Sequence, residues 1–202
     1  MRWPWPAPVD DGSADHLVCG LGLPDIPLPA TSGRMVSLAR VPGRAVVFCY
    51  PWTGRPGVPN PPDWDTIPGA HGSTPEAEGF RDLYPGFAEM PTAVFGLSLQ
   101  PTEEQQEFAS RLALPFELLS DAAQAFQKAL DLPVFETGGA RYLKRLTLFL
   151  QDGRIEQVFY PVHPPNTHAR EVLAYITADI SYEEEARLRS ELPESNSSKT
   201  IR

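Results

Sequence analysis

Ser73 has the surroundings of a reactive site, because Thr74, Pro75 and Glu76 after it predict the first turn of a helix. Either Ser73 caps this helix and Glu76 completes a capping box, or Thr74 is the cap and Pro75 the first helical residue. In both arrangements Ser73 lies at a helix N-terminus, where unpaired N–H groups stabilise an anion. Serine is also a preferred helix cap, worth about 1 kcal/mol, so a purely structural role is equally consistent with the pattern.

His71 lies two residues before Ser73 and is a candidate general base for a serine nucleophile. Such a base needs a third group that orients it, and the nearby carboxylates are Asp65 and Glu76. Spacing alone does not choose between them, and a lone histidine in a loop is more often a solvated or packing residue. A serine-based hydrolase is therefore the weaker chemical interpretation.

Arg145 stands at the start of an apolar strand segment, where a guanidinium is suited to bind an anion or a pair of peroxide-like oxygens. An ion pair with Glu76 or Asp82 is the structural alternative. Both interpretations place a positive charge at the beginning of the strand.

The chain has two cysteines, Cys19 and Cys49, and no CxxC pair or Cys/His cluster at metal-ligand spacing. This pattern indicates neither a disulfide framework nor a structural zinc site, and it favours a cytoplasmic protein. Cys49 lies in a continuous apolar run, so we expect it to be buried. Cys19 lies near the N-terminus, where it is a candidate substitute redox thiol or a partner for Cys49, if their Cα atoms lie within about 7 Å.

The composition limits the classes of partner. The 202 residues carry a formal charge of -9, which argues against nucleic acid or an anionic membrane surface. No stretch approaches the roughly 18 apolar residues of a membrane span, and the N-terminus lacks the apolar segment of a signal peptide. We expect one domain with a single sizeable core.

The elements that must position these side chains alternate along the chain. We predict an irregular N-terminal arm over residues 1–16, one domain over 17–180 and a flexible tail over 181–202. Residues 51–75 contain seven prolines and four glycines, which predicts a long loop. The predicted strands and helices are a hairpin over 28–38, strands 45–50, 93–99, 116–119, 145–150 and 155–160, and helices beginning at 73 or 74, at Thr102 with Gln105 in a capping box, at Asp121, and at Thr167 as far as Ile176.

This order predicts an α/β fold with a central mixed sheet, parallel in its first half and antiparallel at its last hairpin, flanked by helices on both faces. From about residue 20 to 176 the sequence also resembles the AhpC/TSA-type peroxiredoxins of the bacterioferritin-comigratory or Q subgroup, in the thioredoxin-like superfamily. The stretches that carry the resemblance are Pro24-Asp25, Leu28-Pro29-Ala30-Thr31, Val46-Val47-Phe48-Cys49-Tyr50-Pro51, Gly72-Ser73-Thr74-Pro75-Glu76-Ala77-Glu78-Gly79-Phe80-Arg81-Asp82 and Arg145-Leu146-Thr147-Leu148-Phe149-Leu150 before Asp152-Gly153.

The resemblance implies a thioredoxin-like fold with an N-terminal hairpin and a catalytic site at Ser73, Pro51 and Arg145. In that family the peroxidatic cysteine lies at the start of the first long helix, and it falls on Ser73. The threonine expected three residues earlier is Ala70, and the resolving cysteine of many Q-type members is Glu78. A cysteine there would become a thiolate, attack the peroxide O–O bond and form a sulfenic acid, whereas a serine hydroxyl cannot follow this course.

Several functions stay open. The chain is a peroxiredoxin-like protein without the usual peroxidatic chemistry, by natural loss or by an engineered Cys-to-Ser change, or it is a non-catalytic module that binds a ligand or partner. Thr53, in a long insertion over residues 53–65, is a candidate replacement for the missing hydroxyl. The resemblance implies a peroxide or small anionic ligand, a thioredoxin-type reductant if thiol chemistry survives, and a homodimer. We expect no cofactor or metal.

Overall fold

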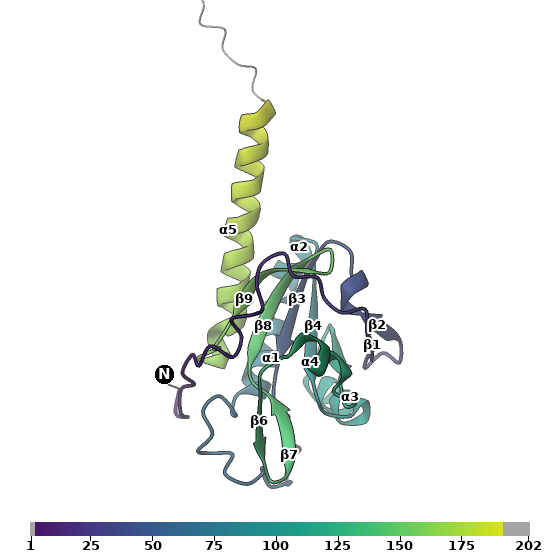
Figure 1. Ribbon diagram of the computed structural model, residues 1–202, viewed down its shortest axis with the longest axis vertical. Helices are drawn as coiled ribbons and strands as arrows, with labels where there is room; N and C mark the ends of the chain where they lie inside the picture. Colours follow the sequence, from purple (N-terminus) through teal and green to yellow (C-terminus); the bar gives the residue numbers. More distant parts are fainter. Residues whose placement is uncertain (1–2, 192–202) are drawn as a thin grey trace, which may run out of the picture.

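A five-stranded mixed sheet forms the centre of the computed structural model, which describes residues 3–191, with side chains described as far as residue 182 (Figure 1). The strand order is β5-β4-β3-β8-β9. β3, β4 and β5 run parallel, β8 runs antiparallel to its neighbour β3, and β9 runs antiparallel to its neighbour β8. The strands are β3 (Arg44–Cys49), β4 (Thr92–Ser98), β5 (Glu117–Ser120), β8 (Leu146–Gln151) and β9 (Arg154–Phe159).

β3 is central because its apolar run can be covered on both faces. Cys49 pairs with Leu97 of β4 on one side and with Leu146 of β8 on the other. Alternate β3 side chains enter two separate core clusters, Val47 one and Phe48 the other. The predicted continuous buried strand is therefore confirmed.

Two groups of elements cover the two faces of the sheet (Figure 1). Phe48 stacks on Phe80 at 4.5 Å between ring centroids in the cluster under the first group, and Phe126 joins the opposite cluster. The first group comprises α1 (Ser73–Asp82), α2 (Tyr84–Glu89), α3 (Thr102–Leu112) and α5 (Pro165–Glu191); the second comprises the hairpin β1 (Pro27–Pro29) and β2 (Met35–Ser37), the short 3-10 helix η1 (Leu38–Arg40) and α4 (Ala125–Leu130). The predicted mixed sheet with flanking helices and an N-terminal hairpin is confirmed.

One hairpin, β6 (Val134–Thr137) with β7 (Ala140–Leu143), is present that the sequence pattern did not predict. Its aromatic side chains hold the long loop in place. Trp64 lies 5.7 Å from Phe135 and 5.1 Å from Tyr142, between ring centroids. The loop, which extends over residues 51–72 before α1, is therefore anchored by aromatic packing despite its lack of regular structure.

The last helix is much longer than predicted. α5 continues from Pro165 to Glu191, so the predicted end at Ile176 is wrong, and part of the predicted tail is helical. Ile176 is fully buried against the sheet, and the helix projects beyond the end of the sheet after it (Figure 1). Residues 192–202 lie outside the described residues. Within the described chain, no helix is both long and apolar enough to cross a membrane.

The predicted capping box at Thr102 is also wrong. α3 begins at Thr102, but no side chain caps it. The Gln105 amide is buried and donates instead to the carbonyls of Gln100 and Leu119, at 3.0 Å each. The Gln105 side chain, which the local pattern predicted to cap the helix, therefore makes tertiary hydrogen bonds instead.

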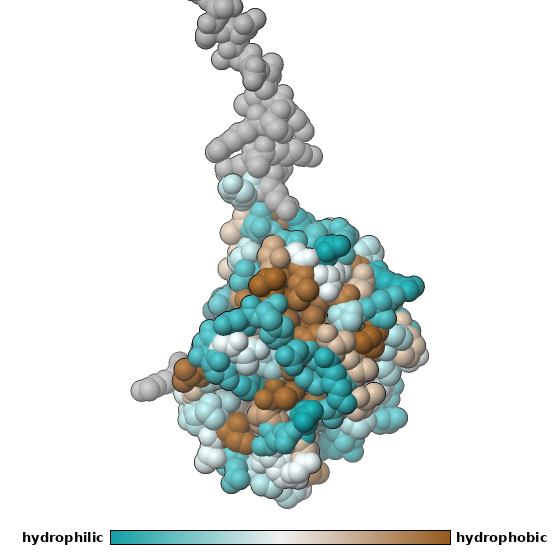
Figure 2. All heavy atoms as spheres, viewed as in Figure 1, coloured by the Kyte–Doolittle hydropathy of each residue, from teal (hydrophilic) through white to brown (hydrophobic). Residues whose placement is uncertain are grey.

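Residues 3–16 form no helix or strand, and they lie against the body of the protein. Asp11 pairs with Lys144 and accepts a hydrogen bond from the Tyr160 hydroxyl at 2.7 Å. Figure 2 shows that the apolar side chains of the viewed face lie in small patches among hydrophilic ones. The division into arm, domain and tail remains a prediction.

Candidate functional site

α1 begins at Ser73 because Gly72 precedes it in a backbone conformation that favours glycine. Gly72 is the N-cap residue, with φ of 115°, and no side chain caps the helix. A Cβ atom on Gly72 would lie 2.2 Å from Cγ of Pro165, so a side chain has no room there. The predicted caps, Ser73 or Thr74, are therefore wrong, and Glu76 is free for another partner.

That partner is Arg145, which joins Glu76 and Ser73 at the base of the site. Arg145 Nη1 forms an ion pair with Glu76 Oε2, and Nη2 donates to Ser73 Oγ at 3.1 Å. The exposed fractions are 3% for Arg145, 5% for Ser73 and 0% for Glu76. Within the described structure, Glu76 Oε1 and Arg145 Nε make no hydrogen bond. The structure thus brings the predicted Ser73 and Arg145 together, and Glu76 is the ion-pair partner of Arg145.

Burial shapes the electrostatics of this pair. Removal from water raises the pKa of Glu76 to about 7, against the opposing effect of the Arg145 charge. A carboxyl group with this pKa is incompletely ionised near neutral pH, whereas a guanidinium stays charged. The base of the site therefore carries a net positive character directly beneath the Ser73 hydroxyl.

Ser73 opens into a cavity of about 380 Å³ between the N-terminal arm, the long loop and the start of α1. All four tryptophans of the chain contribute to its walls. The lining residues are Trp3, Trp5, Trp52, Thr53, Gly54, Arg55, Pro56, Val58, Asn60, Trp64, Ala70, His71, Gly72, Ser73, Thr74, Pro75 and Arg111. None of these wall residues is an aspartate or a glutamate.

His71 is paired, but with groups other than Ser73. Its Nε2 lies 2.8 Å from Asp65 Oδ1, and its ring stacks on Trp5 at 3.8 Å between centroids. No hydrogen bond joins His71 to Ser73 in the described part of the chain. The structure therefore pairs His71 with Asp65, one of the two carboxylates between which the sequence did not choose, without the contact that a serine nucleophile needs.

The other two predicted positions lie at the end of β3. Thr53 is buried in the cavity wall, where its backbone N–H and its hydroxyl both donate to Gln100 Oε1, at 2.8 and 3.0 Å. Pro51 is buried behind the wall, and its carbonyl accepts a hydrogen bond from the Ser98 hydroxyl at 3.3 Å. Pro51 thus shapes the entry of the loop without lining the cavity.

Neither cysteine is placed at the cavity. Cys49 is fully buried, as predicted, and burial raises the pKa of its thiol far above the usual value. Cys19 is exposed, and its Sγ contacts Glu156 Oε2 of β9 at 3.8 Å. The two sulfurs are not bonded to each other. Within the described residues, no group of three or more His, Cys, Asp or Glu side chains could hold a metal ion.

The sequence pattern did not predict the aromatic walls of the cavity. Trp3 and Trp5 lie in a segment that was predicted only to be irregular, and Trp52 and Trp64 belong to the loop. The available signal was that all four tryptophans lie in proline-rich segments without regular structure. Their convergence on Ser73 could not be derived from spacing.

The fold that carries this site matches a known family. The family described as Redoxin matches residues 20–175. The chain belongs to the Redoxin family. Within it, the chain is a peroxiredoxin of the bacterioferritin-comigratory or Q type in the thioredoxin-like superfamily.

Individual proteins similar to this redoxin include peroxiredoxins of known structure. Chloroplastic peroxiredoxin Q of Sedum lineare is 30% identical over 153 residues, which cover 74% of this chain and 73% of the relative. The structure of bacterioferritin comigratory protein from Xanthomonas campestris has 26% identity and a TM-score of 0.63, covering 80% of this chain and 99% of that one. Peroxidoxin BcpB from Mycobacterium tuberculosis has 28% identity and a TM-score of 0.65, covering 81% and 98%. The Xanthomonas protein has alkyl peroxide reduction activity.

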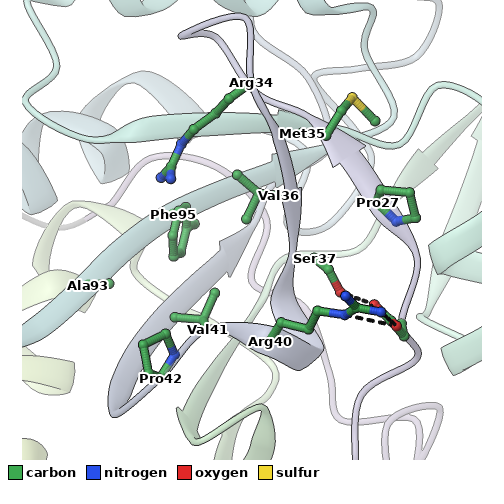
Figure 3. Close-up of a pocket in the computed structure, with 11 residues that line it drawn as sticks. Pro27, Arg34, Met35, Val36, Ser37, Arg40, Val41, Pro42, Ala93 and Phe95 are labelled. Carbon is green, nitrogen blue, oxygen red and sulfur yellow. Dashed lines mark hydrogen bonds and ion pairs between the residues drawn. The ribbon is translucent and has the colours of Figure 1, made fainter.

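A second, larger cavity of about 720 Å³ lies between β2, η1 and β4 (Figure 3). Val36 and Phe95 supply apolar lining, and Arg34 and Arg40 lie along it. Both arginines already pair with carboxylates, Arg34 with a glutamate of β5 and Arg40 with an aspartate that precedes β1. The charges of this cavity are internally balanced, so the cavity at Ser73 is the stronger candidate site of this redoxin.

Proposed function

We propose that this redoxin binds a small oxygen-rich ligand, a peroxide or a small anion, at Ser73, and that it lacks thiol peroxidase turnover. The observation that carries the proposal is the hydrogen bond from buried Arg145 to Ser73 Oγ. It supports a site in which a charged donor is aimed at residue 73 while that residue is a poor nucleophile. The likeness to peroxiredoxin Q supports the view that the oxygens of a peroxide are bound there.

The positions of the cysteines support the loss of turnover. A thiol attacks peroxide only as the thiolate, and burial disfavours the thiolate of Cys49. Cys19 is exposed, and its Sγ donates to Glu156 Oε2 of β9 at 3.8 Å. Neither sulfur forms a hydrogen bond with Ser73 or Arg145 in the described structure. We therefore propose that no thiol of the chain replaces the missing one.

The test is hydrogen peroxide consumption in the presence of dithiothreitol, measured for the full chain and for Ser73→Cys. In the variant, the introduced thiolate attacks the O–O bond, forms a sulfenic acid and releases water after protonation; dithiothreitol then reduces the sulfenic acid. We expect the wild-type chain to match the background and Ser73→Cys to exceed it by at least about 100-fold. Ser110→Cys, an exposed position on α3, is the matched control and should stay near background.

Two results would overturn the proposal. Peroxide consumption by the wild-type chain that is abolished by Cys19→Ala would move the chemistry to another thiol. An inactive but folded Ser73→Cys would show that the environment of residue 73 no longer binds and activates peroxide.

The His71–Asp65 pair favours one second candidate, a serine hydrolase, because it supplies a base with an orienting carboxylate. Hydrolysis of p-nitrophenyl acetate by the wild-type chain and by Ser73→Ala tests it. We expect equal rates near background, since Ser73 bonds to Arg145 instead of His71. A thioredoxin-type reductant, a homodimer and a cytoplasmic location remain predictions of the resemblance and composition.

A further inference from the structure

The walls above Ser73 are aromatic, and they come from two distant segments. Trp3 and Trp5 belong to the N-terminal arm, whereas Trp52 and Trp64 belong to the loop after β3. Since these are all the tryptophans of the chain, the largest aromatic side chains converge on a single cavity. A binding site that only admitted hydrogen peroxide would need no such surface.

Ring contacts hold three of the indoles in place. Trp5 stacks on His71 with an interplanar angle of 11°. Trp64 is 4% exposed and lies edge-on to Trp52, with 5.5 Å between ring centroids. Trp52 also covers Gly54, where an added Cβ atom would lie 3.0 Å from the indole ring. A ligand would therefore meet a largely preformed surface, which lowers the entropic cost of binding.

The charge of the cavity opposes that of the whole chain. The chain has a formal charge of -9, yet the walls contain Arg55 and Arg111 and no acidic residue. Arg111 pairs with Glu107 on its own helix, whereas Arg55 makes no ion pair with any described residue. The cavity is thus complementary to an anion.

The hydrogen-bonding groups of the walls are mostly donors. Ser73 Oγ accepts from Arg145, which leaves the Ser73 O–H to donate. None of the four indole N–H groups donates to a described protein acceptor, and the only side-chain amide in the walls is Asn60. An acceptor-only group, such as a carboxylate, matches this set better than an amide or an ammonium group.

We propose that the cavity binds an aromatic carboxylate, with its ring against the indoles and its carboxylate toward Ser73 and Arg55. The volume of about 380 Å³ lies within the range of small-molecule pockets. This inference rests on the proposed function, because it assigns a ligand class to the same oxygen-binding end. It adds that the ligand carries an aromatic ring, which the four tryptophans would contact.

The test is calorimetric titration of the full chain with benzoate, cyclohexanecarboxylate, benzyl alcohol and acetate. Benzoate and cyclohexanecarboxylate carry the same charge on rings of six carbons, so their difference isolates the aromatic contact. We expect benzoate to bind about 10-fold more tightly than cyclohexanecarboxylate and than neutral benzyl alcohol. Trp5→Ala should lose about 10-fold for benzoate and little for acetate, while Tyr182→Ala, an exposed aromatic on α5, should match the wild-type chain.

The outcomes separate the inference from the proposed function. Equal binding of benzoate and cyclohexanecarboxylate would overturn the aromatic selectivity, and equal binding of benzyl alcohol would overturn the requirement for an anion. Absence of benzoate binding would overturn the inference as a whole. In each case a peroxide-consuming Ser73→Cys would leave the proposed function standing, and an inactive one would remove both.

Discussion

The floor of the Ser73 cavity is an ion pair between Arg145 and Glu76, both inside the regular fold, whereas its walls are tryptophans on segments without regular structure. Glu76 is fixed by α1, and Arg145 directly precedes β8. Trp5 and Trp52 are held by a few ring contacts and by the backbone around them. The same cavity is thus built from parts that are coupled to folding and from parts that can change without unfolding the domain.

Because of this difference, substitutions in the floor and in the walls of the cavity should affect different properties of the protein. Removing only one partner of a buried ion pair strongly destabilises the folded state, because the other charge remains in a low dielectric. An indole on an irregular arm contributes contact area to a ligand and little to the core. Substitutions in the floor should therefore change the free energy of unfolding, and substitutions in the walls should change affinity.

The largest expected effect is that of Arg145→Met, which leaves Glu76 buried without its partner. We expect the free energy of unfolding to fall by about 3 to 5 kcal/mol, measured by urea denaturation near pH 9, where Glu76 of the folded wild-type chain is ionised. Arg154→Met, at an exposed arginine of β9, is the control and should cost less than about 1 kcal/mol. Equal losses would mean that the floor is no more coupled to folding than the surface.

The next effect concerns pH and a second buried polar group, the imidazole of His168 on α5. His168 is 1% exposed and bonds to Thr147 Oγ1 at 2.8 Å, and burial lowers its pKa to about 4. The unfolded chain takes up a proton near pH 6.5 while the folded chain does not. Stability should therefore fall as pH decreases from about 6.5 to 4, by up to about 3 kcal/mol for this group.

Urea denaturation of the wild-type chain and of His168→Gln across this pH range measures the contribution. Glu76 acts in the opposite direction, because its raised pKa makes the stability it contributes decline as pH rises from about 4.5 to 7. The variant keeps Glu76, so the difference between the two pH profiles belongs to His168. Parallel profiles would show that His168 is already protonated in the folded state.

A smaller loss of stability is expected for Gly72→Ala, at the point where the floor of the cavity meets its wall. Gly72→Ala places a methyl group at a positive φ and against Pro165, whereas Gly33→Ala has a positive φ in open space. We expect Gly33→Ala to cost about 1 kcal/mol and Gly72→Ala about 1 to 3 kcal/mol more, by thermal and urea unfolding. Equal costs would show that Pro165 and the Trp3 ring beside it move aside freely.

The smallest expected change in stability is that of Trp5→Ala. The stacked contact with His71 lies in the arm, so unfolding free energy should change by no more than about 0.5 kcal/mol. Urea denaturation of the same sample used for benzoate titration checks this directly. A loss of several kcal/mol would place the arm within the cooperative core and abolish the distinction between floor and walls.

Much of the fold followed from local patterns. The apolar run at β3, the turn between β8 and β9 and the Pro-rich loop after Pro51 each predicted their observed structure. Helix starts were less predictable, because the carboxyl of Glu76 and the amide of Gln105 could satisfy either a cap or a tertiary partner. In both cases the buried tertiary partner was taken, since an unpaired buried polar group costs more than an uncapped helix end.

The sequence by itself determined the sheet, the start of a helix near Ser73 and the absence of a thiol there, since these depend on periodicity, turn residues and residue identity. The tertiary structure gave the hydrogen bond by which Arg145 reaches Ser73 across 72 residues, and it alone decided that His71 does not reach Ser73 and that four tryptophans share one cavity. The physical reason is that local preferences act over a few residues. A buried charge and an aromatic ring find their partners only after the sheet has brought distant segments together.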